Sequence, residues 1–262
     1  MICPKIPTTE QRRRHRAQPN RATVSVNFYR YEDLHLNGRT LIQAWFLRAW
    51  EERIDIKWVQ KQKNVFERWG TDEFTELVHL EQHNFFEAFS YLWYAFNGWA
   101  SCVTDADTDK GYINALAADD IIQRDFLHFM HMTGSPLTFY AGLFAKLWPI
   151  FEDRSLQRLG IFAPPTTIRQ ETVRYYLEHG AFNFQPECWK KHQDADEPAP
   201  TNWFHTLHAL YKVRCNLFHG GKTPDSEIDQ QIIFSAFHTL LYFLRFVNYF
   251  QLDNYPDEYM SE

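Results

Sequence analysis

The sequence has little glycine, little cysteine and no long uninterrupted apolar run. Only 10 glycines occur in 262 residues, beside 23 Phe, 13 Tyr and 9 Trp, which favours helices packed through bulky side chains over a glycine-rich barrel. The four cysteines are scattered and form no Cys-x-x-Cys pair, which fits a reducing cytosol better than a disulfide framework or a structural zinc site. The most apolar stretch, residues 85–100, is interrupted by Glu87, Ser90 and Asn97, so we expect no membrane span.

Positive charge is scarce outside the first residues. The formal net charge is −6, from 27 basic and 33 acidic residues. Residues 1–16 hold five of the basic residues and one acid, which leaves 22 basic and 32 acidic residues in the rest. An acidic body does not bind phosphate backbones non-specifically, so a nucleic-acid site must be small and locally basic. The first residues also lack the apolar segment of a secretory signal, and with the scattered cysteines this predicts a cytoplasmic protein.

The pattern along the chain predicts an all-α fold, because apolar residues recur at helical spacing and no parallel-sheet pattern occurs. Residues 1–21 are typical of a basic disordered arm, and residues 22–70 form an N-terminal helical extension. Residues 71–252 form the main helical domain, with an inserted helical section at about 119–199. Residues 253–262 form an acidic tail.

Apolar periodicity, caps and breakers also predict the individual elements. The extension should contain a short strand or an extended segment at 22–31 and a helix at 40–69, which Gly70 ends. Helices are expected further on at 71–99, 110–130, 137–151, 167–179, 201–219 and 228–250. In the first of these, the aromatic stripe of residues 85–99 lies on one face, which indicates core packing and not a surface for stacking bases.

One segment near the C-terminus combines the residue types that phosphate chemistry needs. Residues 211–222 have the sequence Tyr-Lys-Val-Arg-Cys-Asn-Leu-Phe-His-Gly-Gly-Lys. Arg214 offers a permanently charged fork for a phosphate, and His219 can exchange a proton near neutral pH. Asn216 can orient a hydroxyl or a phosphate oxygen. On an ideal helix Asn216 and His219 share a face and Arg214 does not, but the break at Gly220-Gly221 and the long arginine stem would let them converge.

This Arg-x4-His pattern, followed by Gly-Gly-Lys and lying between two apolar helices, resembles the signature of the HEPN superfamily, whose members are compact helical bundles. The sequence RCNLFHGGK is similar to the form of this motif that is common in bacterial HEPN proteins. Residues 89–99 resemble the first core helix of such domains, with the Phe-Asn pair near its end. The resemblance covers about 74–118 and 200–252, leaves 119–199 as an insertion, and does not explain residues 1–70.

The resemblance implies a metal-independent endoribonuclease without a cofactor. The 2′-hydroxyl of RNA would attack the neighbouring phosphate and leave a 2′,3′-cyclic phosphate and a free 5′-hydroxyl. His219 would act as acid or base, with Arg214 stabilising the developing charge. Lys212 and Lys222 are the candidate RNA-binding cations. HEPN proteins typically form homodimers whose motifs face each other, and many are toxins or phage-defence effectors. The expected partners are therefore RNA, a second copy of the chain, and an antitoxin or sensor protein.

Other interpretations stay open. Some HEPN proteins keep the fold and lack activity, so the alternative function is a catalytically silent module that binds nucleotide, RNA or a partner protein. His79, His83 and Glu87 follow one another at four-residue steps and would suit a metal, but with twelve histidines such spacings arise by chance, and we predict no metal site. Cys215 has no base at nucleophile spacing and is expected to be a packing residue.

Overall fold

The computed structural model describes residues 24–54, 84–162, 168–195, 197–221 and 226–252. Within these ranges the chain is helical apart from one two-stranded antiparallel sheet, which confirms the all-α prediction. The predicted basic arm and acidic tail lie outside the described residues.

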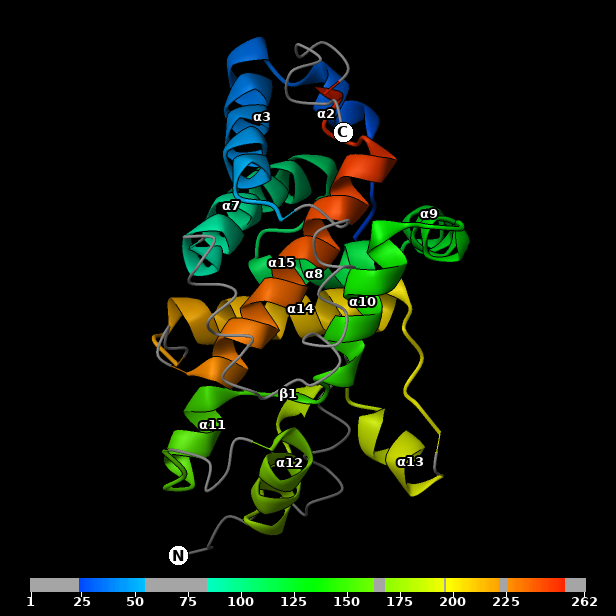
Figure 1. Cartoon of the computed structure of the whole chain (residues 1–262). Coiled ribbons are helices and arrows are strands. Elements are labelled where there is room, and N and C mark those ends of the chain that lie inside the picture. Colours follow the sequence, from blue (N-terminus) through cyan, green and yellow to red (C-terminus); the bar gives the residue numbers. More distant parts are fainter. Residues whose placement is uncertain (1–23, 55–83, 163–167, 196, 222–225, 253–262) are drawn as a thin grey trace, which may run out of the picture.

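The described elements follow one another as a series of short and medium helices. In chain order they are α2 (Tyr29–Asp33), α3 (Leu36–Glu51), α7 (Phe85–Val103), α8 (Asp109–Ala117), α9 (Asp120–His131), α10 (Pro136–Lys146), β1 (Ile150–Phe151), α11 (Asp153–Arg158), α12 (Arg169–Glu178), β2 (Phe184–Gln185), α13 (Trp189–Asp194), α14 (Trp203–Phe218) and α15 (Glu227–Val247). Figure 1 shows α15 running through the middle of the molecule, with α2 and α3 at one end and α11, α12 and α13 at the other.

The last helix, α15, is the centre of the core. Residues 229–244 are all buried, because α7, α9, α10 and α14 pack around the helix. A helix enclosed in this way must satisfy its polar side chains internally. His238 does so by accepting the backbone N–H of Ile54 at Nε2 and donating from Nδ1 to the carbonyl of Phe234. The imidazole therefore fixes the chain that leaves α3 against the central helix.

The aromatic stripe of α7 is core, as the sequence predicts. Phe89, Trp93, Phe96 and Trp99 are at most 1% exposed. Their rings contact one another along the helix, with centroid separations of 5.1 to 6.0 Å. Burial of so much aromatic surface on one face holds α7 against α15 and α3.

Two predicted helices are shorter than expected, because a capping residue interrupts each. The side chain of Asn84 accepts a backbone N–H in the first turn of α7, so a continuous helix across 71–99 is wrong. The helix predicted at 110–130 is in fact two helices, since Asp119 caps the start of α9. Asparagine and aspartate oxygens satisfy the free N–H groups of a helix start, which makes a new helix more stable than continuation of the old one.

The N-terminal extension differs from prediction as well. In the described part of residues 22–31, expected to form a short strand or an extended segment, Val26 forms an isolated bridge with Thr104, and α2 follows. The helix expected at 40–69 ends at Glu51, after which the chain turns toward His238. Everything from residue 55 to residue 83, including Gly70, lies outside the described residues.

The section predicted as an insertion, residues 119–199, has two parts. Its first helices, α9 and α10, pack against α15 in the main core. The helix expected at 137–151 then stops at Lys146, because the chain passes through Pro149, which has no backbone N–H to donate, into β1. The following segments gather around a second, smaller core formed by Phe151, Leu156, Ile161, Val173, Tyr176, Ala181 and Phe184. We call the described residues from β1 to α13 the smaller unit.

Candidate functional site

The candidate motif lies at the end of α14, a helix that is anchored at its start. The side chain of Asn202 caps the helix by accepting the backbone N–H of His205 at 2.9 Å. Leu207, Leu210 and Val213 are fully buried in the main core. These anchors fix the rotation of α14 and so decide which way each motif side chain points.

The C-terminus of α14 is a Schellman motif. Gly220 has φ +71°, a conformation that costs glycine little, and its N–H bonds to the carbonyl of Leu217 at 3.1 Å. The N–H of Gly221 bonds to the carbonyl of Asn216 at 2.8 Å. His219 is the C-cap residue and is exposed. The predicted break at Gly220-Gly221 is confirmed, and it leaves His219 exposed at the end of the helix.

Gly221 has a different role from Gly220. A β-carbon at position 221 would lie 2.5 Å from the Cβ and 2.8 Å from the Cγ of Asp153, closer than side chains pack. A β-carbon at position 220 would meet nothing within 4 Å. The first glycine therefore serves the backbone turn, and the second lets the chain pass against α11.

Asn216 connects α14 to the smaller unit. Its side chain is buried, and its Nδ2 donates to the carbonyl of Phe151 at 2.7 Å. Its Oδ1 accepts the backbone N–H of Asp153 at 3.1 Å. Both ends of the amide are thus bonded to backbone groups at the junction of β1 and α11. In this structure the Asn216 side chain is engaged in positioning those segments.

Arg214 faces α8. Its Nη2 lies 2.9 Å from Oδ2 of Asp109, and its guanidinium carbon lies 5.0 Å from the ring centroid of Phe218. The arginine side chain is 20% exposed. Arg214 and His219 therefore have different neighbours, and the convergence expected from the sequence is not present in this structure.

His219 opens onto a small cavity that α11 helps to form. The cavity has a volume of about 80 Å³ and is lined by Glu152, Asp153, Arg154, Gln157, Cys215, Asn216, His219 and Gly221. Sequence reasoning missed the four residues from the α11 side. They lie some sixty positions before the motif, and no spacing in the sequence connects the two segments. The run Glu-Asp-Arg at 152–154 is the only local signal, and such charged runs are common on exposed helix starts.

Lys212 is paired with the smaller unit. Its Nζ lies 3.6 Å from Oε1 of Glu152 and donates to Oδ1 of Asn183 at 3.1 Å. The hydroxyl of Ser155 also donates to Glu152. This hydrogen bond, helped by the nearby lysine charge, lowers the pKa of Glu152 below its ordinary value although partial burial opposes the shift. Lys222, the other predicted RNA-binding residue, lies outside the described residues.

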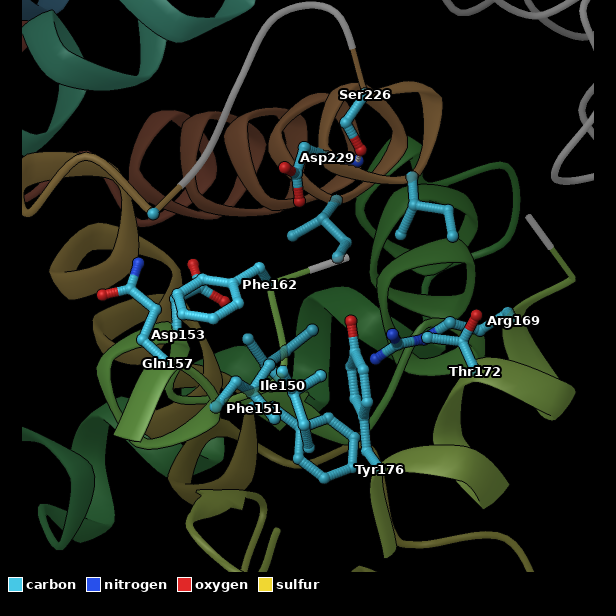
Figure 2. A pocket seen from close by; sticks show the side chains of 15 residues that line it. Ile150, Phe151, Asp153, Gln157, Phe162, Arg169, Thr172, Tyr176, Ser226 and Asp229 are labelled. Atoms are coloured by element: carbon cyan, nitrogen blue, oxygen red, sulfur yellow. Dashed lines mark hydrogen bonds between the residues drawn. The ribbon is translucent and has the colours of Figure 1, made fainter. Parts of the chain in front are cut away.

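A larger cavity adjoins the one at His219. It has a volume of about 240 Å³ and shares Asp153, Gln157 and Gly221 with the smaller cavity. Figure 2 shows Asp153 and Gln157 on the opposite side of this cavity from Arg169. Arg169 donates to the carbonyls of Leu147 and Pro149, and burial lowers its pKa to about 10, so it remains charged at neutral pH. No sequence pattern predicted this cavity.

A cysteine–histidine pair joins α13 to α14. The Sγ of Cys188 lies 3.2 Å from Nε2 of His205, whose Nδ1 lies 2.9 Å from the carbonyl of Pro200. Burial raises the pKa of the Cys188 thiol, so the thiol stays protonated and donates to the imidazole. His205 thus joins α13 to the start of α14.

No group of three or more His, Cys, Asp or Glu side chains within the described ranges is arranged to hold a metal ion. His79 and His83, the metal ligands considered from the sequence, lie outside those ranges.

None of the helices that the structure describes combines the length and apolar character needed to cross a bilayer. Comparison with known proteins assigns the chain to no family, because no family model matches it and no curated protein or solved structure is significantly similar to it.

Proposed function

We propose that this chain is a metal-independent endoribonuclease of the HEPN type, with His219 as the group that transfers a proton. The observation that supports the proposal is the position of His219 at the exposed end of a core helix, beside a cavity. A histidine placed there can meet a phosphate from solvent and can exchange a proton near neutral pH. The fixed end of α14 supplies the rigid support that such a group needs.

The proposed reaction is an attack within the RNA chain. The 2′-oxygen forms a bond to the adjacent phosphorus, and the bond from phosphorus to the 5′-oxygen breaks. The 2′-hydroxyl proton passes to a base, and the departing 5′-oxygen receives a proton from an acid. One imidazole can serve only one of these roles at a time. In a two-fold dimer, His219 of a second copy would take the other role, so a homodimer is part of the proposal.

Arg214 can contribute to this reaction once RNA displaces Asp109. The two side chains of the ion pair are 20% and 39% exposed. The Asp109 carboxylate is the more open of the two, and a phosphate can replace it because its oxygens accept from the guanidinium in the same two-pronged geometry. Arginine cannot act as a base, so its role is to bind and stabilise the phosphate charge.

The surface beside Arg214 fits a second copy of the chain. Tyr94 of α7 and Phe218 of α14 are 44% and 39% exposed, and their ring centroids lie 6.0 Å apart. Exposed aromatic side chains next to one another favour burial by a partner. Light scattering at micromolar concentration should therefore give a dimer mass. A strict monomer, with and without RNA, contradicts this part of the proposal.

Cleavage of labelled RNA by wild-type protein and by His219→Ala tests the function directly. General acid–base catalysis is worth about a hundred- to ten-thousand-fold in rate, so the variant should lose activity by that factor. Chelator should change nothing, and the products should carry a 2′,3′-cyclic phosphate. If both proteins cut equally, or if the wild type needs added metal, the mechanism is wrong.

The chain contains a matched control for this variant. His179 is the exposed C-cap of α12, and Gly180 follows it with φ +81°. The same backbone bonds close that helix, from Gly180 to Leu177 and from Ala181 to Tyr176. His179→Ala therefore removes an imidazole from the same local geometry away from the His219 cavity, and it should leave cleavage unchanged.

A second candidate function is a catalytically silent HEPN-like module that binds nucleotide, RNA or a partner protein. The observation that favours it is that Arg214 and Asn216 both make internal contacts in this structure. If the wild-type protein cuts no RNA in any oligomeric state, this function becomes the better explanation of the motif.

A further inference from the structure

The cavity at His219 needs a cation if it is to receive a phosphate. Arg214 does not line it and points toward Asp109 of α8. Asn216 lines the cavity, but both ends of its amide are bonded to backbone groups. The described residues of the motif therefore bring an imidazole to the cavity and no positive charge.

Arg154 of α11 supplies the missing charge. It lines the same cavity as His219 and is exposed. Its guanidinium makes no hydrogen bond, ion pair or ring contact with any residue that the structure describes. Arginine presents five donors in a planar fork that matches two phosphate oxygens. The side chain can thus turn to a ligand without first leaving an internal partner.

The backbone that carries Arg154 is held in place by the motif helix. Asn216 binds the N–H of Asp153, the residue before Arg154. Lys212 lies 3.6 Å from the carboxylate of Glu152, one residue earlier. Gly221 packs directly against the side chain of Asp153. Three motif residues therefore fix the start of α11 relative to His219, which is the kind of support that keeps two groups in register for one ligand.

We infer that Arg154 and His219 together form the binding site for a phosphodiester of single-stranded RNA, with Arg154 binding the phosphate oxygens and His219 adjacent to the bridging oxygen. The inference rests on the proposed function for the identity of the ligand. It assigns to the α11 segment, which the sequence placed in an insertion, a direct role in the site.

The charges around the cavity favour an internal phosphodiester over a terminal phosphate. Glu152 and Asp153 also line the cavity. The pKa of Glu152 is lowered, so its carboxylate is charged at neutral pH. A phosphodiester carries one negative charge, and a terminal phosphate carries close to two at pH 7. Repulsion by the Glu152 carboxylate therefore weakens binding of the terminal phosphate more, since the interaction grows with the charge of the ligand.

Binding is measured with a short, labelled 2′-O-methyl oligonucleotide, which cannot be cleaved because it lacks the attacking hydroxyl. A charged arginine–phosphate contact is worth about 1.5–3 kcal/mol, so Arg154→Ala should weaken binding roughly 10- to 100-fold. The slope of log affinity against log salt should fall by roughly 0.7, the value for one phosphate contact on a single strand. Arg154→Lys should recover part of the affinity. A 5′-phosphate added to the oligonucleotide should not tighten binding.

Arg158→Ala is the matched control. Arg158 is an exposed arginine on the same helix, one turn further on, and it lines a different cavity. This variant should bind and cleave like the wild type. Both arginine variants should keep the wild-type melting temperature, which shows that any loss belongs to the ligand and not to folding.

Cleavage assays separate failure of the inference from failure of the proposed function. If the wild type cleaves, His219→Ala does not, and Arg154→Ala binds and cleaves like Arg158→Ala, then the inference is wrong and the function stands. If the wild type cleaves no RNA, the proposed function is wrong, and comparing RNA binding by Arg154→Ala and Arg158→Ala still tests the phosphate site. Selective loss of binding in Arg154→Ala then supports a phosphate site in a silent module, and equal binding by the two variants overturns it.

Discussion

Replacing Asn216 by alanine tests whether this motif residue acts on substrate or on the fold. The substitution removes the donor to the carbonyl of Phe151 and the acceptor of the N–H of Asp153. Asn216 itself is 3% exposed, so little solvent reaches the groups left behind. We expect Asn216→Ala to destabilise the protein and to loosen α11 beside His219.

The size of the effect follows from these two bonds. A buried polar group left without a partner costs about 1–3 kcal/mol, so two such groups cost about 2–6 kcal/mol. The cavity at His219 lies next to Asn216, so water can reach one of the two polar groups left without a partner. The expected loss of stability is therefore in the lower half of this range, at about 2–4 kcal/mol. In a chain of this size each kcal/mol lowers the melting temperature by about 2–4 °C, so the midpoint should fall by roughly 5–15 °C.

Thermal and urea unfolding measure this loss, with Asn202→Ala as the control. Asn202 caps the other end of the same helix through one bond to the N–H of His205, and loss of such a cap costs about 1 kcal/mol. Asn216→Ala should cost at least twice as much. If it costs no more than Asn202→Ala and yet abolishes RNA cleavage, the amide acts on substrate and our assignment of a structural role is wrong.

Three further predictions concern the surroundings of the site. Gly220→Ala should cost about 1–2 kcal/mol in urea unfolding, because a side chain at φ +71° is strained although it meets no neighbour, and an unchanged midpoint would contradict the strain. The pKa of Glu152 is lowered by its hydrogen bond from a serine and by the charge of Lys212. The carboxylate therefore stabilises the fold fully above its unfolded pKa of about 4.3, and this stabilisation is lost as the pH falls toward the folded pKa. Glu152→Gln should flatten the decline of the urea midpoint below a pH of about 4.3. Asp109→Asn should free the guanidinium of Arg214 and tighten binding of a 2′-O-methyl oligonucleotide measured by anisotropy, whereas unchanged binding would remove Arg214 from the site.

The helical content and the end of the motif helix could be predicted because their causes are local. Apolar spacing identified α14 and α15, and Gly220 identified the end of α14 through the conformation that its position requires. The buried face of α7 followed from its aromatic spacing in the same way. These features depend on residues within one or two turns of each other, so a single sequence contains the necessary information.

The predicted helix boundaries were wrong where the apolar spacing continued across a capping residue. The predicted helices at 71–99 and 110–130 kept their period through Asn84 and Asp119, and periodicity alone cannot show that a side chain bonds the backbone instead. The helix at 137–151 failed because Pro149 was not taken as a break. Each error came from one polar or cyclic residue whose local bonding outweighed the pattern around it.

The composition of the site was beyond sequence reasoning because its contacts are distant along the chain. Asn216 bonds to Phe151 and Asp153, at sequence separations of 65 and 63 residues. From the sequence alone, Asn216 resembles an amide that orients a substrate, and nothing distinguishes Arg154 from the other arginines. The fold changes both interpretations, since it shows the amide bonded and the arginine beside His219.

The acidic composition of the protein limits how it can bind RNA. A chain with a net charge of −6 attracts RNA weakly, so a site must concentrate its cations. Lys212 and Arg214 are each paired with a carboxylate in this structure, whereas Arg154 is not. The motif residues that face inward therefore affect phosphate binding through α11, because they determine where Arg154 lies relative to His219. A substitution that shifts α11 should weaken RNA binding even if the replaced residue does not contact the RNA. A substitution of Arg154 should weaken RNA binding while α11 stays in place.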